Sequence, residues 1–122
     1  MLPKPYTEPL KPFSTQTLDR ETAGRHETCL AALLSTIPCV TWTPSDVVAD
    51  QKKGVPLNGK WERSLIVFDG RKPVAVLLAY DRPTENNDQY PCDSLYIAGL
   101  AVDPDYRRRG IGKALLDLFL KK

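Results

Sequence analysis

Residues 95–120 read LYIAGLAVDPDYRRRGIGKALLDLFL, and this stretch decides the fold. Its first part is apolar as far as Val102 and is followed by the turn sequence Asp-Pro-Asp at 103–105. Three consecutive arginines and a Gly-Ile-Gly sequence come next, and apolar residues then recur at helical spacing, namely Ile111, Leu115, Leu118 and Phe119. The pattern predicts a strand over 95–102, a basic glycine loop and a helix.

The junction between the loop and the helix is suited to binding phosphates. The first turn of a helix presents backbone N–H groups that have no partner within the helix, and it favours anions. Gly110 and Gly112 have no Cβ that would keep a ligand away from these groups. We therefore expect a cradle for a pyrophosphate just ahead of the last helix.

Two common phosphate-binding motifs do not fit this loop. The P-loop needs a glycine five residues before its Gly-Lys pair and a Ser or Thr after it, but Arg107 and Ala114 occupy those positions. The dinucleotide-binding fingerprint needs a third glycine, and Leu115 stands in its place. A different class of phosphate loop is therefore indicated.

The remaining pattern is Arg107-x-x-Gly110-x-Gly112 after an apolar strand, and it resembles the acetyl-CoA-binding signature of the GNAT N-acetyltransferases. The resemblance implies an α/β fold with a mixed, mostly antiparallel sheet flanked by helices. It also implies acetyl-CoA as cosubstrate and transfer of its acetyl group to a primary amine. The residues that it assigns to acetyl-CoA are Leu100, Ala101, Val102, Arg107, Arg108, Arg109, Gly110, Ile111, Gly112 and Lys113.

The rest of the chain predicts the elements that precede this motif. Asp19 is a suitable N-cap for a helix as far as Ser35, and Thr43-Pro44 suggests a shorter helix to about Lys52. Strands are expected at 13–18, 64–68 and 74–80, with a turn at 69–72. Loops are expected at 54–59 and 81–93. Gly99 is either at a bulge in its strand or packed closely under a neighbouring side chain.

Four prolines among residues 1–12 predict an extended arm, which leaves 13–122 as one domain. A GNAT domain normally continues past the cofactor helix with a strand, a helix and a hairpin, so the expected domain is incomplete at its C-terminus. Three explanations stay open: a fragment of a longer protein, a homodimer or partner segment that completes the sheet, or an inactive homologue. An uncovered strand and a Leu-rich helix favour association.

Charge and cysteine content narrow the functional classes. Residues 107–122 carry a net charge of +5 and the rest of the chain −3, so one end attracts anions. The arginine run could also contact nucleic acid, although base-stacking aromatic residues are not interleaved with it. Three cysteines without metal-ligand spacing indicate reduced thiols and no metal site. The absence of a long apolar stretch or signal peptide predicts a cytoplasmic protein.

The sequence assigns no catalytic residue. Proton removal from the amine could involve Glu85, Asp88, Asp93, Tyr96 or water. Trp42, Trp61 and Tyr90 could line an acceptor pocket, although large aromatic residues more often belong to a core. The alternative functions are a non-catalytic acyl-CoA-binding or regulatory module and, less favoured, a basic nucleic-acid-binding domain. The acceptor cannot be identified from the sequence.

Overall fold

The structure is a computed structural model that describes residues 13–38, 40–52, 54–82 and 94–121. Its main sheet has four antiparallel strands in the spatial order β1 (Ser14–Thr17), β4 (Leu65–Asp69), β5 (Lys72–Arg82) and β6 (Ser94–Val102). Within the described residues β6 is therefore an edge strand. A short separate hairpin joins β2 (Gln51–Lys52) and β3 (Val55–Pro56).

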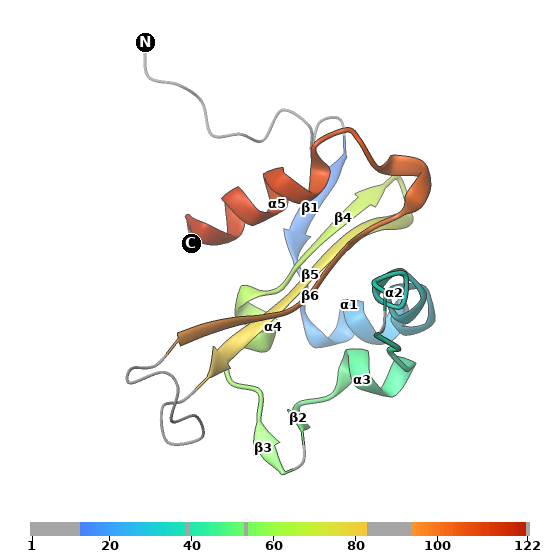
Figure 1. Cartoon of the computed structure of the whole chain (residues 1–122). Coiled ribbons are helices and arrows are strands. Elements are labelled where there is room, and N and C mark those ends of the chain that lie inside the picture. The colour runs from blue at the N-terminus through green and yellow to red at the C-terminus, as the bar shows by residue number, and fades with distance from the viewer. Residues whose placement is uncertain (1–12, 39, 53, 83–93, 122) are drawn as a thin grey trace.

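Helices cover both faces of the sheet (Figure 1). One face packs against α1 (Arg20–Arg25), α2 (Glu27–Leu34) and α3 (Pro44–Val48), and the other packs against α5 (Ile111–Leu120). A single-turn helix, α4 (Lys60–Arg63), leads into β4. The predicted α/β fold, with a mostly antiparallel sheet between helices, is confirmed.

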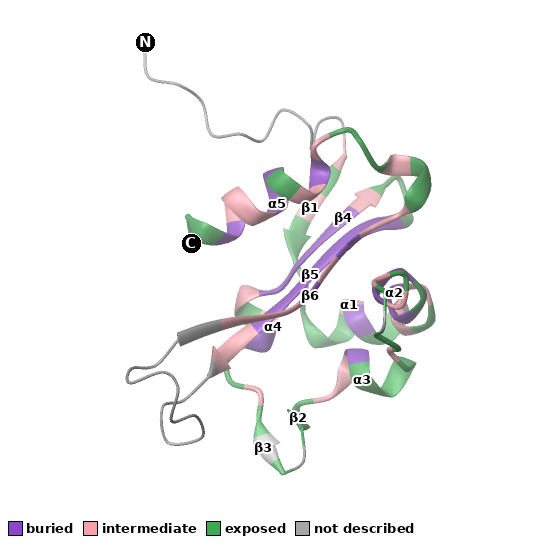
Figure 2. Ribbon diagram, in the orientation of Figure 1, coloured by how far each residue is buried: buried purple, intermediate pink, exposed green. Residues whose placement is uncertain are grey.

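Alternation along the central strands divides the core between the two faces. On β4, Leu65 and Val67 belong to the cluster under α5, whereas Ile66 belongs to the cluster under α1–α3. On β5, Leu77 likewise belongs to the cluster under α5, and Leu78 belongs to the cluster under α1–α3. Because both faces are covered, β4 and β5 are buried along most of their length, while β6 is mainly half-buried (Figure 2).

A β-bulge interrupts the pairing of β6 with β5. Leu78 lies opposite Gly99 and Ala79 lies opposite Ile97, so Ala98 is the extra residue. A Cβ built on Gly99 would lie 2.7 Å from Leu34 Cδ2 and 3.4 Å from Trp42 Cζ2. Both readings of Gly99, as a bulge residue and as a site of close packing, are therefore correct.

Two helices differ from their predictions, and tertiary contacts explain why. The helix expected from Asp19 to Ser35 is divided at His26, whose ring packs edge-on against Phe68 at a centroid distance of 5.3 Å. Gly24, a weak helix former, lies two residues before the break. The Asp19 cap itself is confirmed, because its Oδ1 accepts a bond of 2.7 Å from Thr22 N.

The second helix ends at Val48 instead of continuing to Lys52. Its start is as predicted, since Thr43 and Asp46 form a reciprocal capping box. Its last carbonyls, those of Asp46 and Ala49, accept hydrogen bonds from the Lys60 ammonium in place of a further helical turn. Lys52 belongs to β2, and the predicted loop at 54–59 contains β3.

The other expected elements agree with the structure where it describes them. The strands predicted at 13–18, 64–68, 74–80 and 95–102 correspond to β1, β4, β5 and β6, and Gly70 turns the β4–β5 hairpin with φ of 63°. The arm at 1–12 and most of the 81–93 loop lie outside the described residues. No helix among the described residues has the length and apolar character that a membrane span requires.

Replacing Gly99 with alanine tests the packing at the bulge. We expect Gly99→Ala to reduce the free energy of unfolding by about 1–3 kcal/mol, because the added methyl group overlaps Leu34 against Trp42. Gly24→Ala is the control, since a Cβ there meets nothing within 4 Å and alanine favours the helix. Urea denaturation would measure both, and equal stability of the two variants would contradict this account.

Candidate functional site

The basic loop starts from Asp103, immediately after β6. The Asp103 amide donates to Val74 O at 2.8 Å, so the chain is still held against β5 at this point. Its carboxylate accepts a bond of 2.9 Å from Asp105 N and lies 3.6 Å from Lys72 Nζ. These contacts fix the short 3₁₀ turn η3 (Pro104–Tyr106), so the loop begins in a defined direction.

Tyr106 attaches the loop to the rest of the domain. Its hydroxyl donates to Asp69 Oδ2 at 2.6 Å, and its ring meets Phe13 edge-on at 5.8 Å. The bond to Asp69 raises the pKa of Tyr106, so the phenol keeps its proton and continues to donate. The Arg109 guanidinium lies 5.1 Å from the centre of the same ring. Tyr106 thereby holds the loop against Asp69 at the end of β4 and against Phe13 just before β1.

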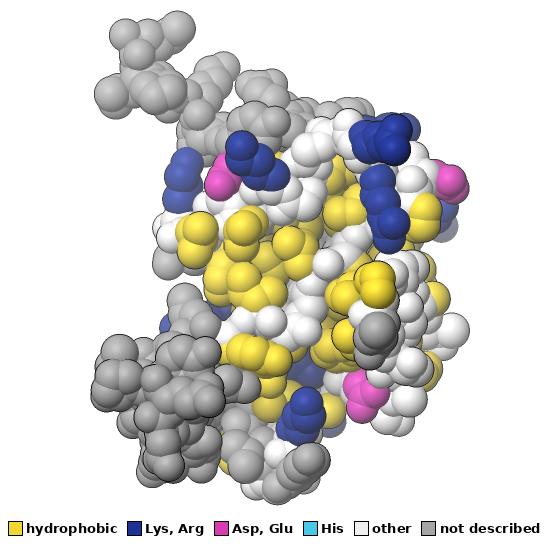
Figure 3. Space-filling model, in the orientation of Figure 1, with side chains coloured by type: hydrophobic (Ala, Val, Ile, Leu, Met, Phe, Trp, Pro, Cys, Tyr) yellow, Lys and Arg dark blue, Asp and Glu magenta, His cyan; other side chains and the backbone are white. Residues whose placement is uncertain are grey.

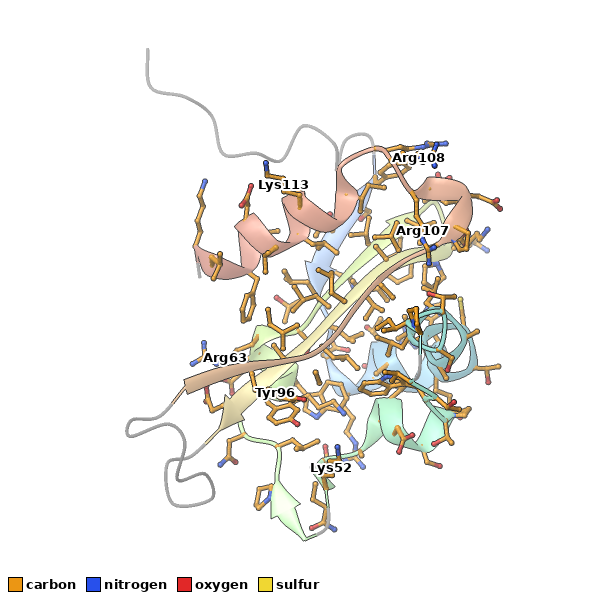
Figure 4. All side chains as sticks on the ribbon, viewed as in Figure 1. Lys52, Arg63, Tyr96, Arg107, Arg108 and Lys113 are labelled. Carbon is orange, nitrogen blue, oxygen red and sulfur yellow. The ribbon has the colours of Figure 1, made fainter. Side chains whose placement is uncertain are left out.

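Arg107, the first residue of the sequence motif, connects the loop to α2. Its Nε donates to Val102 O and its Nη2 donates to Thr36 Oγ1, both at 3.0 Å. In Figure 4 the side chain accordingly points toward α2. Two of the five guanidinium donors are used, so Arg107 orders the loop and keeps donors for an anion.

The backbone then turns sharply into α5. Arg108 and Gly110 both have positive φ, 67° and 79° respectively. Gly110 caps the helix, and the first helical bond runs from Ala114 N to Gly110 O at 3.0 Å. The amides of Ile111 and Gly112 precede this bond and have no acceptor in the described part of the chain. The predicted pyrophosphate cradle therefore has the required donors.

Gly112 leaves space in front of the helix. A Cβ at this position would meet only Val102 Cγ2, at an ordinary contact distance of 3.6 Å. Packing within the domain therefore does not require a glycine here. A phosphate that approaches the helix N-terminus does benefit from the missing side chain, so the residues present fit the phosphate groups of acetyl-CoA.

Positive side chains surround this junction. Arg108, Arg109 and Lys113 are exposed, and Figure 4 shows Arg108 on the outer side of the loop and Lys113 on the outer side of α5. Guanidinium groups can bind phosphate oxygens through paired, charge-assisted hydrogen bonds. The loop thus combines backbone donors with exposed cations, whose charge is opposite to that of a phosphate.

The edge of β6 supplies a second group of backbone donors. Antiparallel strands direct alternate residues toward the neighbouring strand, and Asp103 is paired with Val74. Ala101 must then pair with β5, while Leu100 and Val102 direct their amides to the open edge. Within the predicted triplet, these two residues are the ones that can offer an N–H to a ligand. Binding of acetyl-CoA by the triplet stays a prediction.

Apolar side chains line the space between this edge and α5. The partly buried hydrophobic residues of the two elements are Ile97, Leu100, Val102, Leu116 and Leu118. Figure 3 shows hydrophobic side chains gathered on this face, and Leu120 at the end of α5 is 66% exposed. This apolar surface follows β6 next to the basic loop, so a ligand bound at the loop could lay an apolar arm against it.

A cavity of about 390 Å³ lies on the opposite face, between the sheet and the segments around α3. Its walls are Val40, Thr41, Trp42, Asp46, Ala49, Gln51, Lys52, Leu57, Lys60, Leu78, Tyr80, Tyr96 and Ala98. Of the residues singled out from sequence, Trp42 and Tyr96 are in its wall. Trp61 is not, and its indole donates to Asp50 Oδ1 at 2.9 Å. Glu85, Asp88, Tyr90 and Asp93 lie outside the described residues.

Lys60 is the residue of this cavity that sequence reasoning missed. It is only 3% exposed, and its Nζ donates to Ala49 O at 2.7 Å and to Asp46 O at 3.3 Å. Burial lowers the pKa of Lys60 from 10.5 to about 8, against the opposing charges of Asp50 and Asp46. In the sequence, Lys60 follows a loop glycine and looks like a surface lysine, so no local signal marked it.

The low pKa of Lys60 has a consequence for stability. Between pH 8 and 10.5 the unfolded chain holds this proton and the folded protein does not, so stability rises with pH, by up to about 3 kcal/mol. We expect the unfolding free energy of wild type, taken relative to that of Lys60→Met, to increase with pH across this range. Urea denaturation at pH 7, 8, 9 and 10 would measure it.

The exposed Lys52 provides the control for this prediction. Lys52→Met removes the same charge from the same cavity wall and should show no such change with pH. A constant difference between wild type and Lys60→Met would mean that the buried ammonium has an ordinary pKa.

Other reactive groups are few in the described part of the chain. Burial raises the pKa of the Cys29 thiol, with a smaller contribution from the charge of Asp103, so this cysteine is a poor nucleophile. No cluster of three or more potential metal-ligating side chains occurs among the described residues. Cys39 and Cys92 lie outside them.

Solved structures with the same arrangement of elements are enzymes of one fold. A diaminobutyrate acetyltransferase from Paenibacillus lautus, bound to its substrate and coenzyme A, superposes with a TM-score of 0.63 at 17% identity, covering 90% of this chain and 57% of its own. A ribosomal-protein alanine N-acetyltransferase from Escherichia coli gives 0.59 at 16% identity, with coverages of 89% and 57%. NAA60 from Arabidopsis thaliana, in complex with acetyl-CoA, gives 0.57 at 19% identity, with coverages of 89% and 67%.

These identities are low, so the superpositions establish the fold alone. The chain spans 57% of the length of the first two relatives. No curated protein sequence matches it. The sequence model of the Acetyltransferase (GNAT) family, however, matches residues 14–122, which include every element described above. The chain therefore belongs to the GNAT acetyltransferase family.

Proposed function

We propose that this protein binds acetyl-CoA and transfers its acetyl group to a primary amine. The observation that carries the proposal is the start of α5, where the Ile111 and Gly112 amides and three exposed cations meet at a sharp turn. Family membership and the coenzyme A or acetyl-CoA bound in two of the solved relatives support the same ligand.

The shape of the site suggests how the cosubstrate is divided among the elements. Its phosphates would be held by the loop and helix residues, namely Arg107, Arg108, Arg109, Gly110, Ile111, Gly112 and Lys113. Its pantetheine arm would follow the apolar side chains along β6 and bond to the amides of Leu100 and Val102. The bound cosubstrate supplies a reactive thioester, which the open edge of β6 would expose to the acceptor.

The cavity near α3 is the proposed entrance for the amine. Its wall includes Ala98, the bulge residue next to Gly99, so it borders the strand that would hold the thioester. Attack requires a neutral amine, and the carbonyl oxygen requires a donor as negative charge develops on it. An edge amide of β6 can serve as that donor. Tyr96 lies in the cavity wall, but no residue is assigned as the base.

The relatives act on different acceptors, as their names show, so the acceptor of this chain is a separate question. A non-catalytic acyl-CoA-binding module would show the same cosubstrate binding without turnover. A cytoplasmic location, and a second chain or segment that covers the β6 edge, stay predictions.

A thermal-shift comparison tests the binding site directly. Acetyl-CoA at a hundred times its dissociation constant should stabilise the protein by about 2.7 kcal/mol, which raises Tm by several degrees. Coenzyme A should raise Tm by a similar amount. ATP should raise it less, because ATP lacks the pantetheine arm. Equal shifts with all three would indicate a general phosphate site, and no shift with acetyl-CoA would refute the proposal.

Variants of the loop locate the response. Gly112→Asp places a carboxylate at the helix start and should abolish the shift, whereas Gly112→Ala adds one uncharged methyl group, which the domain itself accommodates at 3.6 Å from Val102 Cγ2, and should reduce the shift less. Arg108→Glu should weaken binding roughly tenfold or more through loss of a charged hydrogen bond. Lys121→Glu, the same charge reversal at the far end of α5, is the control. A shift that survives Gly112→Asp would place the cosubstrate elsewhere.

A further inference from the structure

The Lys60 ammonium is a buried charge that has no ion pair in the described part of the chain, although the charges of Asp50 and Asp46 act on it from a longer distance. Its two hydrogen bonds go to the neutral carbonyls of Asp46 and Ala49, and no ion pair within the described residues includes it. Buried charges in proteins are normally paired, because loss of hydration is costly. An ammonium has three N–H donors, so one is left without a hydrogen bond to these carbonyls. The Trp61 ring, whose centre lies 4.7 Å from Lys60 Nζ, is the other contact of this charge.

The cavity beside Lys60 offers other donors and little negative charge. Lys52 from β2 also lines it, and the Trp42 indole N–H is buried with no hydrogen-bond partner among the described residues. The one carboxylate in the wall, that of Asp46, accepts the Thr43 amide at 2.9 Å. Nearby Asp50 is held outside the wall by Arg20 and by the Trp61 indole.

The remaining walls are mostly apolar or aromatic. Tyr80 and Tyr96 lie together at a centroid distance of 5.3 Å, and Trp42, Leu57 and Leu78 are also in the wall. In Figure 4, Tyr96 comes from β6 and Lys52 from β2, on opposite sides of this space. The cavity therefore suits a ligand that has an apolar or aromatic body and an anionic end.

We propose that the acceptor amine carries a carboxylate, which binds the Lys60 ammonium while the body of the acceptor packs against Trp42, Tyr80 and Tyr96. This inference rests on the proposed acetyl transfer. Lys60 and Ala98 of β6 both line the cavity, so an acceptor whose carboxylate binds the ammonium would also border β6, where its amine would meet the thioester. A polycationic amine is disfavoured, because it would meet two lysines.

A set of four matched aromatic amines tests the charge requirement. The compounds are 4-(aminomethyl)benzoate, 4-(aminomethyl)benzamide, 4-methylbenzylamine and 1,4-bis(aminomethyl)benzene, which differ only in the group opposite the amine. Each is titrated at pH 7 into the protein with coenzyme A, and the indole N–H signals are followed by NMR. The protein has two tryptophans, and a Trp61→Phe variant identifies the signal of Trp42.

We expect the benzoate to bind roughly tenfold or more tightly than the benzamide, the scale of a hydrogen bond to a charged group, and to move the Trp42 signal. The diamine should bind most weakly. Lys60→Met should remove the preference for the benzoate while leaving the acetyl-CoA thermal shift unchanged. Lys52→Gln, on the exposed side of the wall, should reduce the preference less and cannot disturb the buried contacts of α3.

Equal binding of the benzoate and the benzamide, or tighter binding of the diamine, would overturn the inference. A preference for the benzoate that persists in Lys60→Met would overturn it as well. The acetyl-CoA thermal shift separates this outcome from failure of the proposed function. If acetyl-CoA binds and the preference for the carboxylate is absent, only the proposed acceptor class is wrong. If acetyl-CoA does not bind, the acetyltransferase proposal fails, regardless of how the four amines bind.

Discussion

The bulge in β6 is the constraint on which the two halves of the candidate site depend. One extra residue, Ala98, places both Ala98 and Gly99 on the face covered by α2 and α3. Gly99 allows Leu34 and Trp42 to pack directly on the strand, and Trp42 forms a wall of the cavity there. Beyond the bulge the alternation resumes with its phase changed, so that Leu100 and Val102 pack on the α5 side. The proposed sites for the cosubstrate and for the acceptor thus lie on the two sides of one strand.

Rigidity of the basic loop comes from side chains and not from its glycines. Tyr106 bonds to Asp69 across the β4–β5 hairpin, and Arg107 joins Val102 to Thr36 near the end of α2. Gly110 then permits the left-handed turn that points the first amides of α5 outward. Donors held in place before a ligand arrives lose less entropy on binding, which favours recognition of a flexible, phosphorylated cosubstrate. Arg107 also links the loop to the segment that follows α2.

The other half of the site depends on a lysine that shortens a helix. By donating to the carbonyls of Asp46 and Ala49, Lys60 takes the place of the next turn of α3, and the chain is free to form the β2–β3 hairpin below the cavity. The same contacts hold an ammonium group in an apolar wall, with its pKa lowered by burial. Lys60 can cap the end of α3 and also bind a ligand, because the cap uses two of the three N–H donors of its ammonium group.

The sequence by itself determined the fold class and the sheet strands, and it predicts a phosphate site at the basic glycine loop, because each depends on local patterns. Apolar runs bounded by turns predict strands, and glycines placed between arginines and an apolar helix predict a phosphate site. The break at His26, the early end of α3 and the burial of Lys60 depend on residues far away in the chain, namely Phe68 on β4 and the carbonyls that Lys60 reaches across 14 and 11 positions. The cavity beside Lys60 was decided by tertiary structure alone, since its wall gathers residues from 40–52, 57–60, 78–80 and 96–98, which have no common sequence pattern.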